Sequence, residues 1–470
     1  CAAAGVQSLR SPEQPPLQRI DHDDHDQADQ EESIAFCEKI FAQNLQGAKL
    51  MTNSRHLRGS AWLNFQRVVC EQWWLKNQHN SHVVLMGDAV HTAHFAIGSG
   101  TKLAIEDAIE LTRQFQLLGD SPEHIGEVLS TYQELRRVET LRLQNAAWNA
   151  MEWFEACGKR YCDPLEPEQF MYSMLTRSQR ISHENLRLRD ANWLGNYEKW
   201  FAQKAGLELT KGAPVPPPMF TPYTIRGLTL KNRIIVSPMA QYSASNGLVG
   251  DYHLVHLGAR AMGGAGLVFA EMIGVCPEGR ITPACPGLYT PEQQQAWKKI
   301  VDWIHHHTDA KFAMQLGHAG AKASTRVAWE GIDQPLESGN WPIISASPQQ
   351  YLEGVSQVSS PMTRADMDEV TAQFVASTIA AAQINVDWLE LHCAHGYLLS
   401  SFISPLTNQR QDEYGGCLAN RLRYPLEVFK AIRDVFTSEK PISVRISATD
   451  WAENGISEQE AITIATAFKN

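Results

Sequence analysis

The second half of the chain alternates short apolar segments with amphipathic helical segments. The expected strands cover residues 232–239, 266–273, 311–318, 387–395 and 442–447, and the expected helices cover residues 251–262, 291–307, 365–384 and 457–470. Apolar strands separated by helices are typical of a parallel sheet covered on both faces. A closed (β/α)8 barrel has eight such units, so the sequence predicts an α/β fold with an incomplete TIM barrel of about five βα units. We expect the other units beyond residue 470 and, because the chain starts at Cys1 rather than methionine, a fragment cut at both ends.

A proline-rich segment precedes this alternation. Residues 211–222, KGAPVPPPMFTP, contain five prolines, which indicate a semi-rigid extended linker. Residues 122–205 before it are expected to be largely helical. The predicted domains are therefore a first domain at 1–120, a helical extension at 121–210, the linker at 211–222 and the barrel at 223–470.

Composition excludes several classes of protein. No apolar run approaches the roughly 18 residues of a membrane span, so we expect a cytoplasmic protein without membrane contact. The net charge of −11 argues against a nucleic-acid partner. The nine cysteines are scattered and never at C-x-x-C spacing, which predicts reduced thiols and no zinc site.

Several histidines stand near acidic residues or in runs. The stretch DHDDHDQADQEE at 21–32 is expected to be an acidic, solvated lead-in to a helix at 31–46. The run 305–307 is expected to be a solvated helix end, where positive charge is favourable. His253 and His256 lie within an expected helix and are interpreted as packing or capping residues. No metal site is predicted.

Polar side chains follow the expected barrel strands where each strand ends. They are Ser237 to Ala240 after the first strand, Gln315 and His318 on the third, the segment from Glu390 to Tyr397 on the fourth, and Arg445 on the fifth. In a barrel these ends meet at one mouth, where reactive groups lie. A histidine pair followed by a tyrosine suits two N–H donors for a carbonyl oxygen and a phenol as proton source. A metal site is disfavoured because no carboxylate stands at a matching spacing.

The blocks around these residues carry a resemblance. They are NRIIVSPMAQYSA, DYHLVHLGARAMGGAGLVFAEM, QLGHAG, ELHCAHGYLLSSFISPLTNQRQDEYGG and NRLRYPLEVFKAIR. Together they resemble the Old Yellow Enzyme family of FMN-dependent ene-reductases, over about residues 219–470. The resemblance implies that Pro238, Met239 and Ala240 lie against the isoalloxazine ring, that Gln315 bonds its pyrimidine edge, and that Arg445 stabilises the anionic reduced flavin.

The same resemblance assigns the substrate side of the site. It implies that His392 and His395 hold the carbonyl of a conjugated enone while hydride adds to the β-carbon, and that Tyr397 protonates the α-carbon. Tyr242, as a substrate contact, and Arg410 are weaker candidates.

The first domain carries a different signature, MGDAVHTAHFAIGSGTKLAIEDA at residues 86–108. An expected strand, a Gly-Asp pair, a glycine turn and a helix follow one another, which is typical of phosphate or ribityl binding. The block resembles FAD-dependent aromatic-ring hydroxylases, which implies that Asp88 binds the FAD ribityl chain while Gly98, Ser99 and Gly100 give backbone contacts. His91 or His94 faces the flavin or belongs to the core. No G-x-G-x-x-G pattern occurs, and we expect it upstream of Cys1.

The order of the two halves resembles the bifunctional 2-aminobenzoyl-CoA monooxygenase/reductase family, with salicylyl-CoA 5-hydroxylases as near neighbours. It implies hydroxylation of an aromatic acyl-CoA at FAD with O2 and NADH or NADPH, reduction of the resulting enone at FMN, and a homodimer. Four arginines are open to either CoA phosphates or surface ion pairs: Arg177, Arg180, Arg187 and Arg189. Two alternatives remain: an NAD(P)H-dependent ene-reductase whose first domain only docks, and a non-catalytic binding module.

Overall fold

The computed structural model describes residues 30–49 and 68–469. By their internal contacts the residues fall into two compact units, unit 1 at Cys1–Leu194 and unit 2 at Gly195–Asn470. Residues 21–29 of the acidic stretch lie outside the described residues.

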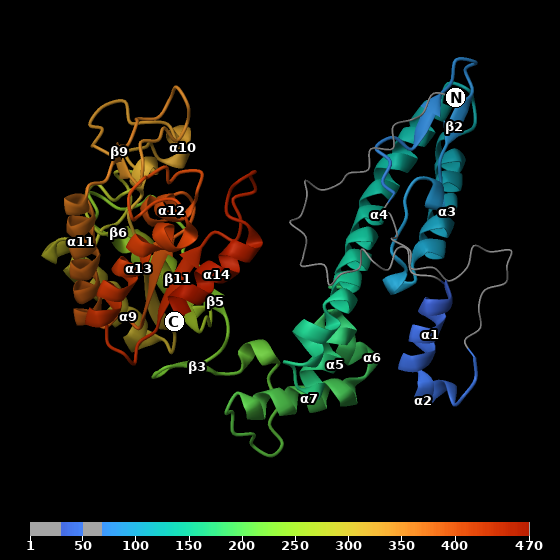
Figure 1. The fold of residues 1–470 in the computed structure, drawn as a ribbon, viewed down its shortest axis with the longest axis horizontal. Coiled ribbons are helices and arrows are strands. Elements are labelled where there is room, and N and C mark those ends of the chain that lie inside the picture. The colour runs from blue at the N-terminus through green and yellow to red at the C-terminus, as the bar shows by residue number, and fades with distance from the viewer. Residues whose placement is uncertain (1–29, 50–67, 470) are drawn as a thin grey trace. The chain divides into compact units, whose positions relative to one another are not determined.

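Unit 1 is mainly helical (Figure 1). Its longest helices, α3 (Gly100–Leu118) and α4 (Ile125–Glu155), follow each other through a short loop and pack together. The remaining elements are α1 (Gln30–Ile40), α2 (Ala42–Leu45), β1 (Trp74–Lys76), β2 (His82–Val84), η1 (Gly87–Ala89), η2 (Phe95–Ile97), η3 (Cys157–Cys162), α5 (Pro167–Thr176), α6 (His183–Arg189) and the start of α7 (Ala191–Lys204). The helical character expected of residues 122–205 is confirmed.

The strands of unit 1 are three residues long each. β1 and β2 form a small antiparallel hairpin in which Trp74 pairs with Val84. A core of Trp73, Val90 and Tyr132 lies beside the hairpin. Tyr132 belongs to α4, so this helix packs against the hairpin and helps to bury its apolar side chains.

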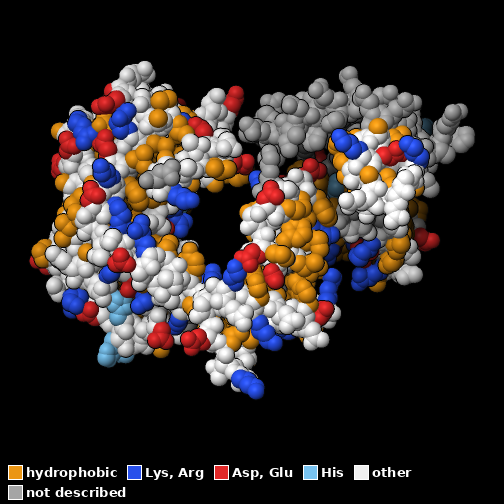
Figure 2. All heavy atoms as spheres, turned by 60° about the horizontal axis from the view of Figure 1, so that its bottom comes forward, with side chains coloured by type: hydrophobic (Ala, Val, Ile, Leu, Met, Phe, Trp, Pro, Cys, Tyr) orange, Lys and Arg blue, Asp and Glu red, His pale blue; other side chains and the backbone are white. Residues whose placement is uncertain are grey.

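Large hydrophobic side chains remain on the surface of unit 1 (Figure 2). Those of α3 and α4 include Ile105, Ile109, Leu135, Val138 and Trp148. These two helices therefore bury one face and keep apolar groups outside it.

Unit 2 is built on a five-stranded parallel sheet with the order β11–β10–β7–β6–β5 (Figure 1). The strands are β5 (Ile235–Val236), β6 (Leu267–Gly274), β7 (Lys311–Gly317), β10 (Trp388–Cys393) and β11 (Ile442–Ile446). The larger helices are α8 (Asp251–Met262), α9 (Pro291–His307), α11 (Arg364–Gln383), α13 (Leu418–Val435) and α14 (Glu458–Lys469). The prediction of five βα units in a TIM-barrel-type α/β fold is confirmed.

The first barrel strand is shorter than the expected 232–239. β5 ends at Val236, two residues before Pro238, which has no N–H to give to a strand ladder. The segment that follows is therefore a loop at the carboxyl end of the sheet, next to the site described below.

A hairpin and several connections were not anticipated. The hairpin pairs β3 (Tyr223–Ile225) with β4 (Leu228–Leu230). The other elements are η4 (Pro218–Phe220), η5 (Gly320–Lys322), α10 (Ala328–Gly331), β8 (Ile344–Ser345), β9 (Ser360–Pro361) and α12 (Leu398–Ile403). Leu228 and Leu230 pack against Leu267, Ala313 and Trp388 near the starts of three barrel strands, so the hairpin covers the amino-terminal end of the sheet.

The histidines of α8 and α9 have structural partners. His305 is not solvated as expected, because its Nε2 lies 2.6 Å from Oδ2 of Asp387. His253 is buried near the start of α8, where its Nδ1 accepts a hydrogen bond from the Gly250 N–H, which agrees with a capping role. Across the described part of the chain, no cluster of three or more His, Cys, Asp or Glu side chains is suited to a metal ion.

The helices of the described residues differ from membrane-spanning ones. None of the helices there combines the length and the apolar character that crossing a bilayer requires.

Candidate active site at the carboxyl ends of the strands

His392, His395 and Tyr397 come together where β10 ends. The ring centroids lie 5.0 Å apart for His392 and His395, and 4.8 Å apart for His392 and Tyr397. His395 has a φ of +61°, a left-handed conformation that is uncommon for a non-glycine residue. The tight turn between β10 and α12 therefore places three side chains from six consecutive residues on one spot.

The hydrogen bonds of the two imidazoles run in one direction. The Ala394 N–H donates to Nδ1 of His392, at 3.2 Å, so the proton of the neutral His392 ring lies on Nε2. That N–H points to Nδ1 of His395, also at 3.2 Å. His395 then carries its own proton on Nε2. The pair thus presents one outward N–H donor, from His395, where the sequence suggested two.

Burial keeps all three groups in their neutral forms. It lowers the pKa of His392 to about 3, with a smaller contribution from neighbouring His395. Burial also lowers the pKa of His395, with Arg445 and Lys322 adding to the effect. The pKa of Tyr397 is raised, mainly by burial, so its phenol keeps its proton at neutral pH.

A buried carboxylate links the polar residues of three neighbouring strands. Oε1 of Glu390 lies 2.7 Å from Nε2 of Gln315 and 3.0 Å from Nε of Arg445. Ser443 donates to Oε2 at 3.0 Å. Sequence reasoning gave Glu390 no role, although a glutamate within the otherwise apolar strand WLELHC was a signal.

The segment Pro238 to Ala240 follows β5, which is the last strand in the order of the sheet. Met239 is about half exposed, and the next residue, Gln241, donates its N–H to Oε2 of Glu271 at 2.8 Å. Glu271 fixes where this loop leaves the sheet.

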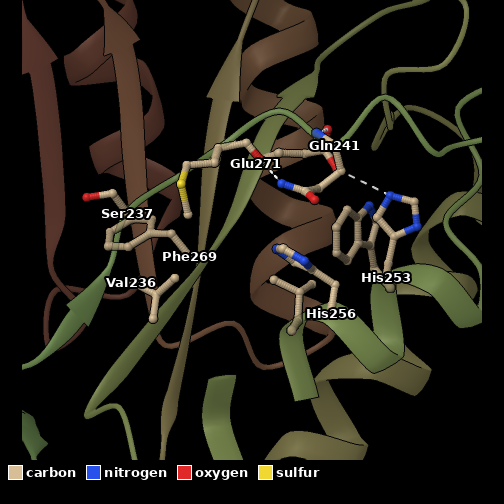
Figure 3. Close-up of a pocket in the computed structure, with 10 residues that line it drawn as sticks. Val236, Ser237, Gln241, His253, His256, Phe269 and Glu271 are labelled. Atoms are coloured by element: carbon tan, nitrogen blue, oxygen red, sulfur yellow. Dashed lines mark hydrogen bonds and ion pairs between the residues drawn. The ribbon is translucent and has the colours of Figure 1, made fainter. Parts of the chain in front are cut away.

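A small pocket lies behind that loop, between β6 and α8 (Figure 3). Oε1 of Glu271 and Nε2 of His253 face each other there at 3.2 Å, and neither atom makes a hydrogen bond. The pocket adjoins the loop after β5 and does not include the His392, His395 and Tyr397 set.

Aromatic side chains and one lysine surround the histidines. Nζ of Lys322 lies 4.2 Å from the ring centroid of Tyr351 and 5.6 Å from that of Tyr397. Tyr242 packs in the same cluster as Tyr397 and meets Trp329 edge to face. Burial raises the pKa of Tyr242 to about 12. The role of Tyr242 as a substrate contact stays a prediction.

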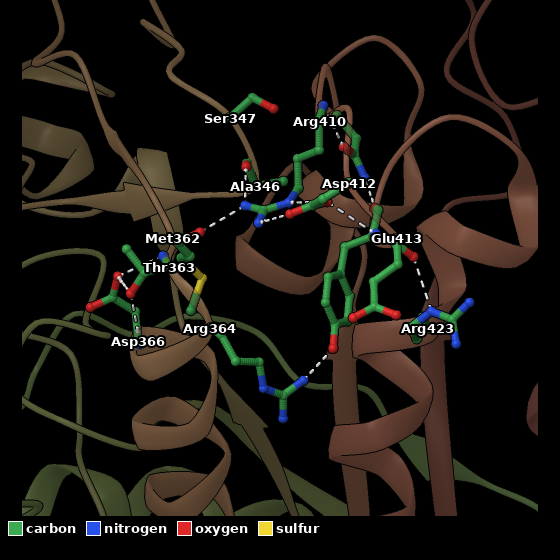
Figure 4. Close-up of polar contacts among 12 residues, drawn as sticks. Ala346, Ser347, Met362, Thr363, Arg364, Asp366, Arg410, Asp412, Glu413 and Arg423 are labelled. Carbon is green, nitrogen blue, oxygen red and sulfur yellow. Dashed lines mark hydrogen bonds and ion pairs between the residues drawn. The ribbon is translucent and has the colours of Figure 1, made fainter.

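Arg410 has a structural role (Figure 4). Its Nη1 donates to the carbonyl oxygens of Ala346 and Met362, and its Nη2 pairs with Asp412. With its Nε also donating to Asp412, the guanidinium uses four of its five N–H groups within the chain and ties loops together.

His318 is also structural. It is buried, and its Nδ1 accepts from the Gly320 N–H at 3.0 Å, so it shapes the turn after β7.

Comparison with known proteins decides the family. A model of the NADH:flavin oxidoreductase / NADH oxidase family matches residues 218–470. The chain belongs to this family. The resemblance to Old Yellow Enzymes, a group of flavin-dependent oxidoreductases, is thereby supported for the C-terminal half.

Three curated relatives of the NADH:flavin oxidoreductase half illustrate the match. An NADH:flavin oxidoreductase of Gibberella zeae is 42% identical over 239 residues, which are 50% of this chain and 58% of that protein. An NADPH dehydrogenase of Bacillus cytotoxicus is 38% identical over 253 residues, covering 53% and 68%. An NADPH dehydrogenase of Listeria monocytogenes is 39% identical over 262 residues, covering 53% and 70%. The chain thus spans only part of the length of these relatives, 58% for the first.

Solved structures show weaker likeness. A 2-naphthoyl-CoA reductase in complex with 2-naphthoyl-CoA is 25% identical with a TM-score of 0.49, over 54% of this chain and 38% of that chain. Morphinone reductase in complex with tetrahydroNAD is 24% identical with a TM-score of 0.45, over 54% and 69%.

The Gly-Asp signature of unit 1 lies outside the family match. Gly87 begins η1 with a φ of +57°, and Gly98 ends η2 with a φ of +62°, so both turns need glycine. Asp88 is exposed on η1, and Ser99 and Gly100 begin α3. The expected order of turn and helix is therefore present.

Asp107 of α3 is a buried carboxylate that contacts the turn at Gly87, and the sequence reasoning missed it. Its Oδ2 accepts from the Gly87 N–H at 3.0 Å and meets Nε2 of His91 at 2.8 Å, while Nε of Arg136 lies 2.9 Å from Oδ1. The hydrogen bonds and ion pairs outweigh burial and lower the pKa of Asp107. His91 thus belongs to the core, and Asp107 joins η1, α3 and α4.

Two of the four arginines considered for CoA phosphates make local side-chain contacts. Arg187 pairs with Glu184. Arg177 donates to the carbonyl of Met174 and lies over the ring of Phe154. The contact of Arg187 is thus a surface ion pair, as one of the two interpretations expected, whereas Arg177 bonds the backbone of its own helix.

Proposed function

We propose that the protein is an NAD(P)H-dependent ene-reductase that holds FMN at the carboxyl end of the unit 2 sheet. The observation that carries the proposal is the gathering of one imidazole N–H, from His395, and one partly buried phenol, of Tyr397, beside the Gln315 and Arg445 pair. This arrangement supplies what reduction of an activated alkene requires, a donor for the carbonyl oxygen and a proton source.

The chemistry of the donor set fits FMN. Arg445 is about one third exposed and uses only its Nε in the pair with Glu390, so no Nη hydrogen bond to the rest of the described chain occupies its remaining donors. A guanidinium suits the edge of the ring on which the reduced flavin carries its charge. Gln315 and the Pro238 to Ala240 loop would hold the rest of the ring. When bound, FMN supplies the redox chemistry, transfer of hydride from NADH or NADPH to the alkene.

The residues of the chain perform the remaining steps. His395 donates its Nε2 proton in a hydrogen bond to the carbonyl oxygen, which draws electrons from the conjugated alkene. His392 holds His395 in the required tautomer. Tyr397 gives its phenolic proton to the α-carbon as hydride reaches the β-carbon, and the phenol regains a proton from water.

The test uses the complete protein with NADH or NADPH and cyclohexenone without oxygen. We expect extractable FMN and stoichiometric conversion of the enone to the saturated ketone. A protein that holds no FMN, or that oxidises the nicotinamide without forming the ketone, would overturn the proposal.

A second candidate function adds hydroxylation in the first domain. It is favoured by the glycine turns at Gly87 and Gly98 and by Asp88 on η1. In this second candidate function the domains have the expected bounds 1–120, 121–210, 211–222 and 223–470. The protein would be a cytoplasmic homodimer that hydroxylates an aromatic acyl-CoA with O2. FAD would be held by Asp88, Gly98, Ser99 and Gly100. Equal amounts of FAD and FMN per chain, with O2 uptake that depends on the acyl-CoA, would support it, and FMN alone would rule it out.

A further inference from the structure

We propose that Glu390 is a positioning residue that orients Gln315 and Arg445 toward the flavin and lowers the flavin's reduction potential. The inference rests on the proposed function, because it requires FMN at this end of the sheet. Its basis is a carboxylate that is 9% exposed and bonded to both side chains through a single oxygen, Oε1.

The contact is imposed by strand register. Glu390 lies in β10 opposite Gln315 of β7 and opposite Ser443 of β11. Arg445 lies two residues after Ser443, and residues two apart point to the same face of a strand. Three neighbouring strands therefore deliver their polar side chains to one carboxylate.

The carboxylate determines which way the Gln315 amide points. Because Nε2 donates to Glu390 at 2.7 Å, the amide oxygen is turned away from the carboxylate, since two oxygens without a proton between them repel. The amide then offers an acceptor on its other side. The pyrimidine edge of a flavin contains an N–H, which needs such an acceptor.

The carboxylate also offsets the charge of Arg445. The guanidinium favours the anionic reduced flavin, and a negative charge 3.0 Å from its Nε weakens that effect in a site with little water. Removal of the negative charge should therefore make the flavin easier to reduce.

The test compares midpoint potentials in the complete, FMN-loaded protein. Glu390→Gln removes the charge and keeps an acceptor, and we expect a positive shift of the flavin midpoint potential in a spectrally monitored redox titration. Asp302→Asn, an exposed carboxylate on α9, is the control and should leave the potential unchanged. An unchanged or lower potential in Glu390→Gln would overturn the inference.

A second comparison covers the case in which Glu390→Gln does not fold. Arg445→Gln and Arg445→Gln/Glu390→Gln differ only at Glu390, and the double variant leaves no buried charge without its partner. We expect the higher potential in the double variant, and equal potentials would refute the role of Glu390. Glu390→Asp keeps the charge and should stay nearer the wild-type potential than Glu390→Gln.

The outcomes separate this inference from the proposed function. A wild-type protein that binds FMN and reduces cyclohexenone, with no dependence of potential on Glu390, overturns only the inference. A protein without FMN overturns both.

Discussion

The phenol of Tyr397 is the acid of the proposed reaction, and burial keeps it protonated. Tyr397→Phe removes the proton and little else, so we expect enone reduction to slow by roughly 10²-fold or more, as is usual for loss of a general acid. Flavin reduction by NADPH, measured separately by stopped flow, should stay near normal. Tyr223→Phe, on the exposed hairpin strand β3, is the control. Equal slowing of both half-reactions in Tyr397→Phe would contradict the assignment.

Two buried histidines, His318 and His392, make the free energy of unfolding depend on pH. Burial lowers the pKa of His318 from 6.5 to about 4 and that of His392 to about 3. Below about pH 6.5 each ring binds fewer protons in the folded chain than in the unfolded chain. The lowered pKa therefore does not affect stability above about pH 6.5. It lowers the free energy of unfolding as the pH falls from about 6.5 to the pKa of the folded state. Near pH 5 the loss is roughly 2 kcal/mol per histidine.

Thermal unfolding at pH 7 and pH 5 checks this sign. His318→Asn keeps an acceptor for the Gly320 N–H and should lose less stability between the two pH values than the wild type. His306→Gln, which replaces an exposed histidine of α9, should behave as the wild type does. The same pH dependence in His318→Asn and the wild type would show that the ring is not the cause.

At the scale of elements, the close approach of η5 to α12 holds Tyr397 in place. Gly320 has a φ of +63°, and a Cβ there would lie 2.8 Å from the backbone nitrogen of Leu398. Gly320→Ala should therefore be less stable than Gly339→Ala by about 2 kcal/mol, since both glycines have positive φ but Gly339 has open space around it. Chemical denaturation measures the difference, and enone reduction should fall in Gly320→Ala alone. Equal stability would mean that the chain relaxes there at no cost.

The sequence predicted those elements that have strong periodicity. The helix expected at 251–262 is α8 with the same bounds, and the strands β6, β7, β10 and β11 lie within a residue or two of their expected bounds. The hairpin of Tyr223 to Leu230 was missed because its strands are three residues long and follow prolines. Such short strands are fixed by contacts with residues distant in sequence, such as Trp388, which no local pattern records.

The site was predictable where it follows one strand and not where it depends on register. His392, His395 and Tyr397 lie within six consecutive residues, and the structure brings them together. Glu390 acquires its role only through pairing with β7 and β11, and Asp107 only through a contact with Gly87 twenty residues earlier. A single sequence gives no register between distant segments, so these two carboxylates could not be assigned from it.

On the scale of the whole molecule, each unit has a hydrophobic core of its own. We therefore expect two unfolding transitions, of which only one responds to FMN. A ligand present at a hundred times its Kd stabilises the domain that binds it by about 2.7 kcal/mol. Differential scanning calorimetry with and without added FMN measures the effect, with adenosine monophosphate as the control. A single transition that shifts with FMN would show that the two units unfold together.

The hairpin of β3 and β4 closes the amino-terminal end of the unit 2 sheet. With the amino-terminal end filled by Leu228 and Leu230, the proposed flavin site is reached from the opposite end of the sheet, where His395 and Arg445 lie. NADPH and an enone would then share one entrance to the site and bind alternately. Alternate binding produces parallel lines in double-reciprocal plots of the rate. An excess of either reactant should inhibit the reaction of the other.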